Sequence, residues 1–527
     1  MYDYLIQNAN ILDGSGAPAY PGDVAISSGS IAAVGHLAEL QAAYVVDAAG
    51  RYLTPGFIDV HRHGEVAVFR PDFGKAELAQ GLTTILNGNC GLSVAPICGA
   101  HSGALTQYLA PITGRLPKGL DASSFAAYRR HLAAQPLRLH VGTLVGMGTL
   151  RACTAGFSDR ELTDSEYHQL HKLLEDSLAG GTVAVSLGLG YAPECFYSTE
   201  SLLRALAPLR RSGVTVAVHM RQEGDGVVDA LKEILTVARA LETPVQISHL
   251  KAIGHRNWRR AVPEMLQLLE QARQDGVDIA CDVYPYPAGS TQLIHTLPPE
   301  FQDGGIPALT EALRDPNKRS QMRRRMETAE DFENLTLLVG FENIRPTSLT
   351  HPENRKYEGM TLAEIAASQG KDPYDALFDL LASEGCAPSM IDTITHEEDI
   401  DEILRAPFST VISDATYPEG GLPHRRVFGT YPRILETYVR KRGVLTLPEA
   451  VRKLTRLPAD RFSLTKKGRI EVGADADLCL FDLKNIHEAG TWLSPAQIAA
   501  GMDYVFVNGQ PAIAEGQFTG SFCGKAL

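Results

Sequence analysis

Several features that would narrow the class of a protein are missing from this sequence of 527 residues. It has only eight cysteines, scattered with no Cys-x-x-Cys pair, which argues against a disulfide framework and against a zinc ribbon. No apolar run approaches the roughly 20 residues that a membrane helix needs. The first residues, MYDYLIQNANILDGSG, lack a basic segment followed by an apolar one, so we expect no secretory signal.

Positive charge is also scarce. The chain has 49 Lys and Arg against 62 Asp and Glu, a net charge of −13. A nucleic-acid binder normally carries a basic face, so the charge balance argues against that class. Hydrophobic residues make up 44% and charged residues 21%, which indicates a globular rather than a disordered chain. We therefore expect a cytoplasmic protein without membrane or nucleic-acid partners, while its oligomeric state cannot be read from the sequence.

Apolar, strand-like runs alternate with helical patterns through most of the chain. Eight such runs can be identified: GFIDVHRH, TTILNGN, LHVGTLVG, TVAVSLG, TVAVHM, PVQISH, DIACDVYPY and STVISD. Near-continuous apolar strands separated by helices are typical of a parallel sheet that helices cover. Eight repeats over residues 57–465 predict an α/β fold, a (β/α)8 TIM-like barrel that carries the catalytic site.

The two ends of the chain resemble each other. Residues 1–56 and 466–527 both read as short strands joined by turns rich in Gly, Asp and Pro. We predict that together they form one small β-sandwich-like domain. An insertion at about residues 291–345 interrupts the barrel and includes the charged, helical pattern DPNKRSQMRRRMETAEDFENL. This insertion is interpreted as a solvated excursion, with a lid or a dimer contact as alternatives.

Metal-binding side chains lie at or just after the ends of five predicted strands. They are His61, His63, Cys90, His219, His249 and Asp414. The carboxyl ends of barrel strands meet at one rim, where barrel enzymes place their sites. Because residues i and i+2 of a strand point to the same side, His61 and His63 can reach one ion. Imidazole, thiolate and carboxylate together suit Zn²⁺. One such residue could be an ordinary buried group, but six in barrel order predict a zinc site.

Longer phrases carry a resemblance to a known family. The HxH motif after PGFID and the phrases GNCGLSVAP, VHMRQEGD, ISHLKAIG, DVYPYPAGST, PHRRVFGTYPRIL and GADADLCLFD resemble the N-acyl-D-amino acid deacylases (D-aminoacylases) of the amidohydrolase superfamily. The resemblance spans nearly the whole chain. It implies zinc-dependent hydrolysis of an N-acyl-D-amino acid, with a carboxylate and a free D-amino acid as products.

The resemblance also implies roles for the metal-binding residues. Cys90, His219 and His249 would hold a tight zinc ion, and the remaining three would line a second position that is weak or empty in this family. Many relatives bridge two metals with a carboxylated lysine on strand four. The fourth run, TVAVSLGLGY, has no lysine, and Cys90 in the bridging position fits that absence. A bound zinc ion would make hydroxide available near neutral pH and polarise the amide carbonyl.

The implied catalytic residue is Asp414, which would take the proton of the attacking water and deliver it to the departing amine. Support of a histidine is the alternative role. The residues implied to contact the substrate carboxylate are Lys251, Tyr191, Tyr284, Ser290 and Arg426. The tyrosines could instead serve packing, and the serine could set a turn. Arg425 is an extra cation, and it remains open which arginine faces the pocket. With Lys251, the two arginines could favour an acidic side chain.

Some positions depart from the family pattern. Arg62, Gly64 and Glu65 stand where relatives often have threonine and an acidic pair, and Met147 replaces a histidine, which makes the pocket more apolar. The substrate and the reaction therefore have alternatives: another small amide, such as a hydantoin or a dipeptide, or a non-catalytic metal-binding role. The missing strand-four lysine argues against a hydantoinase-like enzyme, and the complete ligand set with Asp414 argues against a non-catalytic protein.

Overall fold

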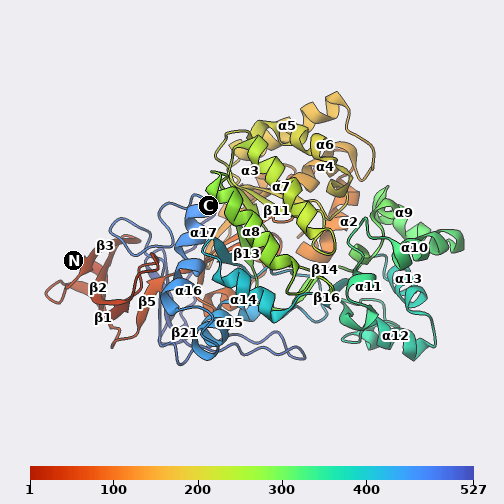
Figure 1. Ribbon diagram of the computed structural model, residues 1–527. Helices are drawn as coiled ribbons and strands as arrows, with labels where there is room; N and C mark the ends of the chain where they lie inside the picture. Colours follow the sequence, from red (N-terminus) through yellow and green to blue (C-terminus); the bar gives the residue numbers. More distant parts are fainter.

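Parallel strands wrapped by helices form the centre of the molecule. The computed structural model describes all 527 residues. Figure 1 shows a separate sheet on the left of the central body and a group of helices on the right. None of the helices combines the length and the apolar character needed to cross a bilayer.

Eight strand positions make up the barrel, in the order of the chain. The strands are β6 (Phe57–Arg62), β7 (Leu82–Asn87), β8 (His140–Thr143) continued by β9 (Val145–Gly146), β10 (Val185–Gly188), β11 (Val216–His219), β12 (Val245–Ile247), β13 (Ile279–Val283) and β17 (Ser409–Val411). They pair in parallel in two runs, β6-β7-β8 and β9-β10-β11-β12-β13-β17. Two backbone hydrogen bonds of 2.9 Å, from Asp414 N to His61 O and from His63 N to Ala415 O, join the last strand to the first. The predicted (β/α)8 barrel is confirmed.

Helices cover the barrel because each presents an apolar stripe to the strands. In α7 (Val227–Leu241), Leu231, Ile234 and Leu235 are buried at helical spacing. The helix α5 (Asp164–Ala179) begins at a capping box in which Thr163 and Glu166 satisfy each other's backbone donors. The other helices around the barrel are α1 (Lys75–Ala79), α2 (Ser102–Thr113), α3 (Phe125–Ala133), α4 (Met147–Ala155), α6 (Thr199–Ala205), α8 (Ala261–Gln274), α14 (Glu397–Arg405), α15 (Arg426–Arg433), α16 (Leu447–Leu454) and α17 (Arg456–Arg461).

The two ends of the chain form one nine-stranded sheet. Its strands are β1 (Tyr2–Ile11), β2 (Tyr20–Ser27), β3 (Ser30–Gly35), β4 (Ala42–Asp47), β5 (Tyr52–Pro55), β18 (Leu478–Phe481), β19 (Met502–Val507), β20 (Gln510–Ala514) and β21 (Gln517–Phe518). The antiparallel pair β5–β18 joins the N-terminal half to the C-terminal half. A buried ion pair ties the sheet to the barrel, since Asp477 Oδ1 lies 3.1 Å from His140 Nε2 of β8.

A long excursion separates β13 from β17. It contains β14 (Ala288–Gln292), β15 (Ile344–Thr347) and β16 (Ser389–Thr393), which pair in the order β14-β16-β15, and α9 (Gly305–Ala312), α10 (Pro316–Thr328), α11 (Leu335–Leu338), α12 (Leu362–Gln369) and α13 (Pro373–Ser383). These are the helices on the right in Figure 1. The charged sequence pattern at residues 315–335 contains α10. Asp315 is the N-cap of this helix, and Pro316 is its first residue. The predicted insertion at 291–345 lies inside this excursion, which shares a second hydrophobic core with α2, α4 and the loops of the barrel rim.

Candidate metal centre and active site

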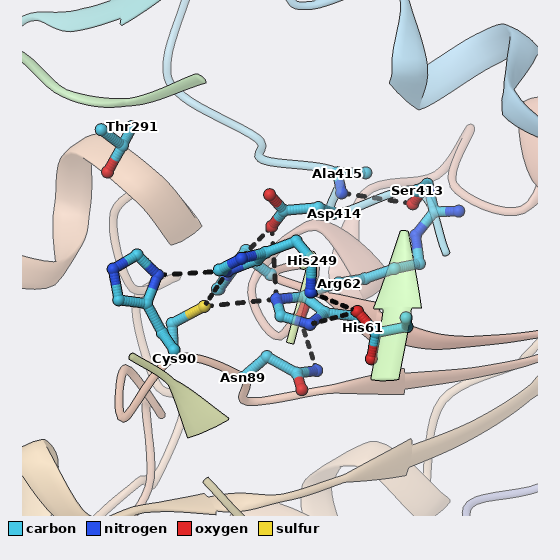
Figure 2. A network of polar contacts seen from close by, with 12 residues as sticks. His61, Arg62, Asn89, Cys90, His249, Thr291, Ser413, Asp414 and Ala415 are labelled. Carbon is cyan, nitrogen blue, oxygen red and sulfur yellow. Dashed lines mark hydrogen bonds and ion pairs between the residues drawn. The ribbon is translucent and has the colours of Figure 1, made fainter. Parts of the chain in front are cut away.

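The predicted ligands converge at the carboxyl ends of the strands. Cys90 Sγ lies 3.4 Å from His249 Nε2 and 3.2 Å from His61 Nε2. The Nδ1 atom of His219 lies 3.1 Å from His249 Nε2. In Figure 2 the sulfur of Cys90 points between the imidazole rings of His249 and His61, with the carboxylate of Asp414 across the same space. The thiol is therefore shared between two overlapping groups, Cys90–His219–His249 and His61–His63–Cys90–Asp414.

The first of these groups fits a zinc ion. With bond lengths of about 2.0–2.3 Å, neighbouring ligand atoms of a zinc tetrahedron stand about 3.3–3.6 Å apart, close to the separations observed here. Burial holds the pKa of His249 well below its usual range and lowers that of His219 to about 3, so both imidazoles are neutral, the form that binds a metal. Burial raises the pKa of the Cys90 thiol, and a bound cation would act in the opposite direction.

Three of the site residues have left-handed backbone conformations. The φ angles are 54° at Cys90, 37° at His249 and 51° at Asp414. Such conformations cost non-glycine residues about 1–3 kcal/mol each and persist only where the surroundings enforce them. All three occur where a strand turns into its loop at the site. The surrounding structure therefore offsets the conformational cost at these three residues, whose side chains point into the site.

The turn that carries Cys90 is held by a side chain of β10, the strand beyond β8 and β9. Ser186 Oγ donates to Gly88 O at 2.6 Å and accepts from Gly91 N at 3.0 Å. Both glycines have positive φ, and a Cβ at Gly88 would clash with the carbonyl of Leu144. The fourth barrel strand, β10, thus contributes the Ser186 hydroxyl, which supports the turn at Cys90. It has no lysine that could bridge two metal ions.

The carboxylate of Asp414 faces His61 at the end of β6 and His63 just beyond it. Its Oδ1 lies 3.3 Å from His61 Nε2 and 3.3 Å from His63 Nε2, and its Oδ2 pairs with Arg426 at 2.9 Å. Burial alone would raise the pKa of Asp414, but Arg426 and the histidines outweigh it and hold the pKa well below its usual range. Asp414 is therefore an ionised base in a fixed orientation.

Two further carboxylates that the sequence analysis did not single out contact the candidate metal-binding histidines. Glu223 accepts from His249 Nδ1 at 2.9 Å and from Lys251 Nζ at 2.5 Å. Asp282 accepts from the backbone N of His249 at 2.5 Å, and its Oδ1 is 4.0 Å from His61 Nδ1. Carboxylates behind metal-binding histidines fix the tautomer and make the imidazole more basic. The spacing of Glu223, four residues beyond His219 in VHMRQEGD, was the available signal.

The departures at residues 62 and 64 have structural explanations. Arg62 points away from the two histidines, as strand alternation requires. Its guanidinium is fully buried and pairs with Asp59 at 3.1 Å, with Glu77 at 2.7 Å and with the hydroxyl of Tyr417. Gly64 leaves no room for a side chain, because a Cβ there would lie 2.9 Å from Asn87 Oδ1. Arg62 and Gly64 therefore contribute to the packing around the site and not to the group of candidate metal ligands.

Glu65 is buried, and burial raises the pKa of its carboxyl from 4.5 to about 8. The folded state therefore keeps a proton that the unfolded chain releases, so stability is lost as the pH rises from about 4.5 to 8. Glu65→Gln removes this titration. We expect the wild type to lose about 2–4 kcal/mol more than the variant between pH 5 and pH 9 in denaturant unfolding. Parallel pH profiles for the two proteins would contradict this assignment.

Several residues predicted to contact the substrate line one cavity beside the metal-binding cluster. Lys251, Tyr191, Tyr284 and Ser290 are among its lining residues. Arg426 reaches its edge, donating to Ser290 O at 3.0 Å while its guanidinium lies 4.8 Å from the ring centroid of Tyr284. The charge of Glu223 outweighs burial and raises the pKa of Lys251, so this lysine stays cationic. The cavity thus has two cations close to the metal-binding groups.

Two predicted substrate contacts lie outside this cavity. Arg425 pairs with Glu488 at 2.8 Å and donates to Gly490 O, so it faces the segment that leads to the small sheet. Met147 is fully buried at the start of α4 in the main hydrophobic core. The structure therefore places Arg426, not Arg425, at the site.

The excursion supplies cavity residues that the sequence analysis did not single out. They are Thr291, His295, Glu333, Leu335, Asp392 and Ile394. His295 packs its ring against Tyr191, with centroids 4.8 Å apart. These residues come from three separate parts of the excursion, so no local motif identifies them.

The comparisons with known proteins agree with this geometry. The amidohydrolase family profile matches residues 44–513, and this chain belongs to that family. It is 34% identical to D-aminoacylase from Alcaligenes xylosoxydans xylosoxydans over 100% of this chain and 97% of that protein. N-acyl-D-aspartate deacylase from the same organism is 32% identical over 98% of this chain and 93% of its own length. The resemblance to N-acyl-D-amino acid deacylases is confirmed.

Solved structures point the same way. N-acyl-D-glutamate deacylase from Bordetella bronchiseptica, complexed with zinc and a phosphonate inhibitor that mimics the tetrahedral intermediate, superposes with a TM-score of 0.84 at 30% identity over 100% of this chain and 99% of that one. A D-aminoacylase with a binuclear metal centre has a TM-score of 0.83 at 31% identity, with full coverage of both chains. L-Hydantoinase from Arthrobacter aurescens covers 99% of both chains at a TM-score of 0.57 and 15% identity, which shows a shared fold alone.

Proposed function

We propose that this protein hydrolyses the amide bond of N-acyl-D-amino acids in a zinc-dependent reaction that yields a carboxylate and a free D-amino acid. The observation that carries the proposal is the position of Asp414. Its carboxylate touches the metal-binding histidines on one side and Arg426 on the other, at the rim of a cavity that also holds Lys251. A base, a metal site and a pair of cations for an anionic substrate thus meet in one place.

Each group has a distinct task in this reaction. Cys90, His219 and His249 would hold the zinc ion, which would lower the pKa of bound water and polarise the substrate carbonyl. Asp414 accepts the proton of the attacking water at Oδ1 and delivers it to the departing amine, while Arg426 keeps the carboxylate in place. His61 and His63 lie against the same oxygen and could hold a second, weaker ion together with Asp414.

The substrate carboxylate would be held by Lys251, Tyr284 and Arg426. The Lys251 ammonium lies 5.8 Å and the Arg426 guanidinium 4.8 Å from the ring centroid of Tyr284, so the two cations converge around one phenol. A guanidinium can bind a carboxylate through two parallel hydrogen bonds. Ser290, whose carbonyl is fixed by Arg426, and Tyr191, whose hydroxyl contacts Thr291 at 2.9 Å, complete the wall.

A substrate panel tests the proposal. The zinc-loaded full chain is assayed for release of free amine from N-acetyl-D-methionine, N-acetyl-L-methionine and a D-dipeptide, and for opening of a 5-substituted hydantoin. We expect the N-acetyl-D-amino acid to be hydrolysed at least about a hundredfold faster than its L enantiomer, because the fixed carboxylate and base accept one configuration. Absence of amine release from every N-acyl-D-amino acid, or faster hydantoin opening, would refute the proposal.

A further inference from the structure

Four carboxylates line the cavity beside the metal-binding cluster: Glu223, Glu333, Asp392 and Asp414. Two of them are paired with the cations of the site. Glu223 accepts from Lys251 Nζ at 2.5 Å, and Asp414 pairs with Arg426 at 2.9 Å. Both negative charges are therefore balanced within the site.

A third carboxylate is also satisfied. Glu333 Oε1 lies 3.1 Å from His295 Nε2, and its Oε2 accepts from the backbone N of Glu223 at 2.7 Å. Burial would raise the pKa of Glu333, but His295 outweighs it and the pKa is lowered. His295 Nε2 is therefore engaged by Glu333 and is not free to bind an anionic ligand.

Asp392 differs from the other three. It is 3% exposed and lines the cavity, yet its carboxylate has no hydrogen bond and no ion pair. It lies on β16 in register with Gly289 of β14. Burial and the charge of Glu333 raise the pKa of Asp392 to about 6, which leaves it mostly ionised at neutral pH. A buried carboxylate without a partner is costly unless a ligand supplies one.

Asp392 and Tyr284 both lie close to a glycine on the paired strand. A Cβ at Gly289 would lie 2.7 Å from Ile394 Cδ1, 3.1 Å from Asp392 Oδ1 and 3.3 Å from the hydroxyl of Tyr284, so a larger residue would push these groups apart. The missing side chain therefore lets this carboxylate come close to the phenol around which Lys251 and Arg426 converge. An N-acyl-D-amino acid held at that phenol by its α-carboxylate would share the cavity with Asp392, which lines it together with Lys251 and Tyr284.

We propose that Asp392 determines side-chain specificity, accepting hydrogen bonds from a cationic side chain so that N-acyl-D-amino acids of the lysine and arginine type are preferred over acidic ones. This inference rests on the proposed function. The carboxylate repels the side chain of aspartate or glutamate and attracts an ammonium or guanidinium group. It replaces the expectation that Lys251, Arg425 and Arg426 favour acidic substrates.

Three substrates of similar length separate charge from size: N-acetyl-D-lysine, N-acetyl-D-norleucine and N-acetyl-D-glutamate. We expect the wild type to rank them in that order by kcat/KM. Asp392→Asn should lower kcat/KM for the lysine substrate by roughly 30-fold, chiefly through KM, and change the norleucine value by less than about threefold. The glutamate value should rise.

The matched control is Arg425→Ala, which removes a charge outside the cavity and should leave the three ratios unchanged. Asp392→Ser provides a second variant, and thermal midpoints and zinc content establish that each variant is folded. A wild type that prefers glutamate, or an unchanged lysine-to-norleucine ratio in both Asp392 variants, would overturn the inference and leave the deacylase proposal standing. No turnover of any N-acyl-D-amino acid would overturn both.

Discussion

Asp414→Asn should lower kcat by about 10³-fold while the protein keeps one tightly bound zinc ion per chain. An amide cannot take up the proton of water, and positioned acid–base groups contribute about 10²–10⁴-fold to rate. The tight ligands Cys90, His219 and His249 do not include Asp414 in the proposed assignment, and they stay in place. KM should change little, because the lost interaction is made mainly in the transition state.

The control for this variant is Asp401→Asn, which alters a carboxylate paired with Arg442 at 2.5 Å, away from the cavity. It should retain near wild-type turnover. Steady-state kinetics and metal analysis of both variants provide the measurement. Near-normal turnover in Asp414→Asn would show that this carboxylate only supports His61 and His63. Loss of the tight zinc from the same variant would show that Asp414 is a primary ligand.

Cys90→Ser should lose both the tight metal and the activity. A serine hydroxyl does not ionise as a thiol does, so the zinc ion loses its only thiolate ligand. Zinc affinity should fall by at least about a hundredfold, more than the loss typical of a residue that merely supports a ligand. Competition with a chromophoric chelator measures this affinity directly. High zinc concentrations should restore only part of the activity.

Two comparison variants sharpen this test. Cys386→Ser changes a buried cysteine in the excursion and should leave zinc affinity unchanged. His61→Asn removes a ligand of the second position and should retain the tight zinc. If Cys90→Ser binds zinc as tightly as the wild type, the shared position of its sulfur, 3.4 Å from His249 and 3.2 Å from His61, has no role in holding the metal.

The barrel, and the convergence of the candidate metal ligands at its rim, could be predicted because both depend on local pattern. An apolar run followed at once by His61, His219 or His249 marks a buried strand that ends at the rim. The alternation of strand side chains also explains why Arg62 points away from its two histidine neighbours. The ion pairs of Arg62 with Asp59 and Glu77 could not be predicted, because the sequence pattern does not show which buried charged residues lie next to each other in the fold.

The substrate cavity was harder to predict for the same reason. Asp392 and Gly289 meet only because β14 and β16 pair across the long excursion. Arg425 and Arg426 are neighbours in sequence, yet the start of α15 directs one toward Glu488 and the other toward Asp414. Met147 lies in the core because its backbone begins α4 there. Each outcome depends on long-range packing, whereas the ligand positions depend on strand ends.

Zinc titration of the chelator-treated full chain tests the central claim most directly. Hydrolysis of N-acetyl-D-methionine is followed as zinc is added, with bound metal measured in the same samples. We expect no activity without metal and a linear rise that reaches its maximum at about one zinc per chain because, of the two overlapping groups, the one at Cys90, His219 and His249 is assigned the tight ion. Undiminished hydrolysis by the metal-free chain, or no hydrolysis at any zinc content, would contradict it.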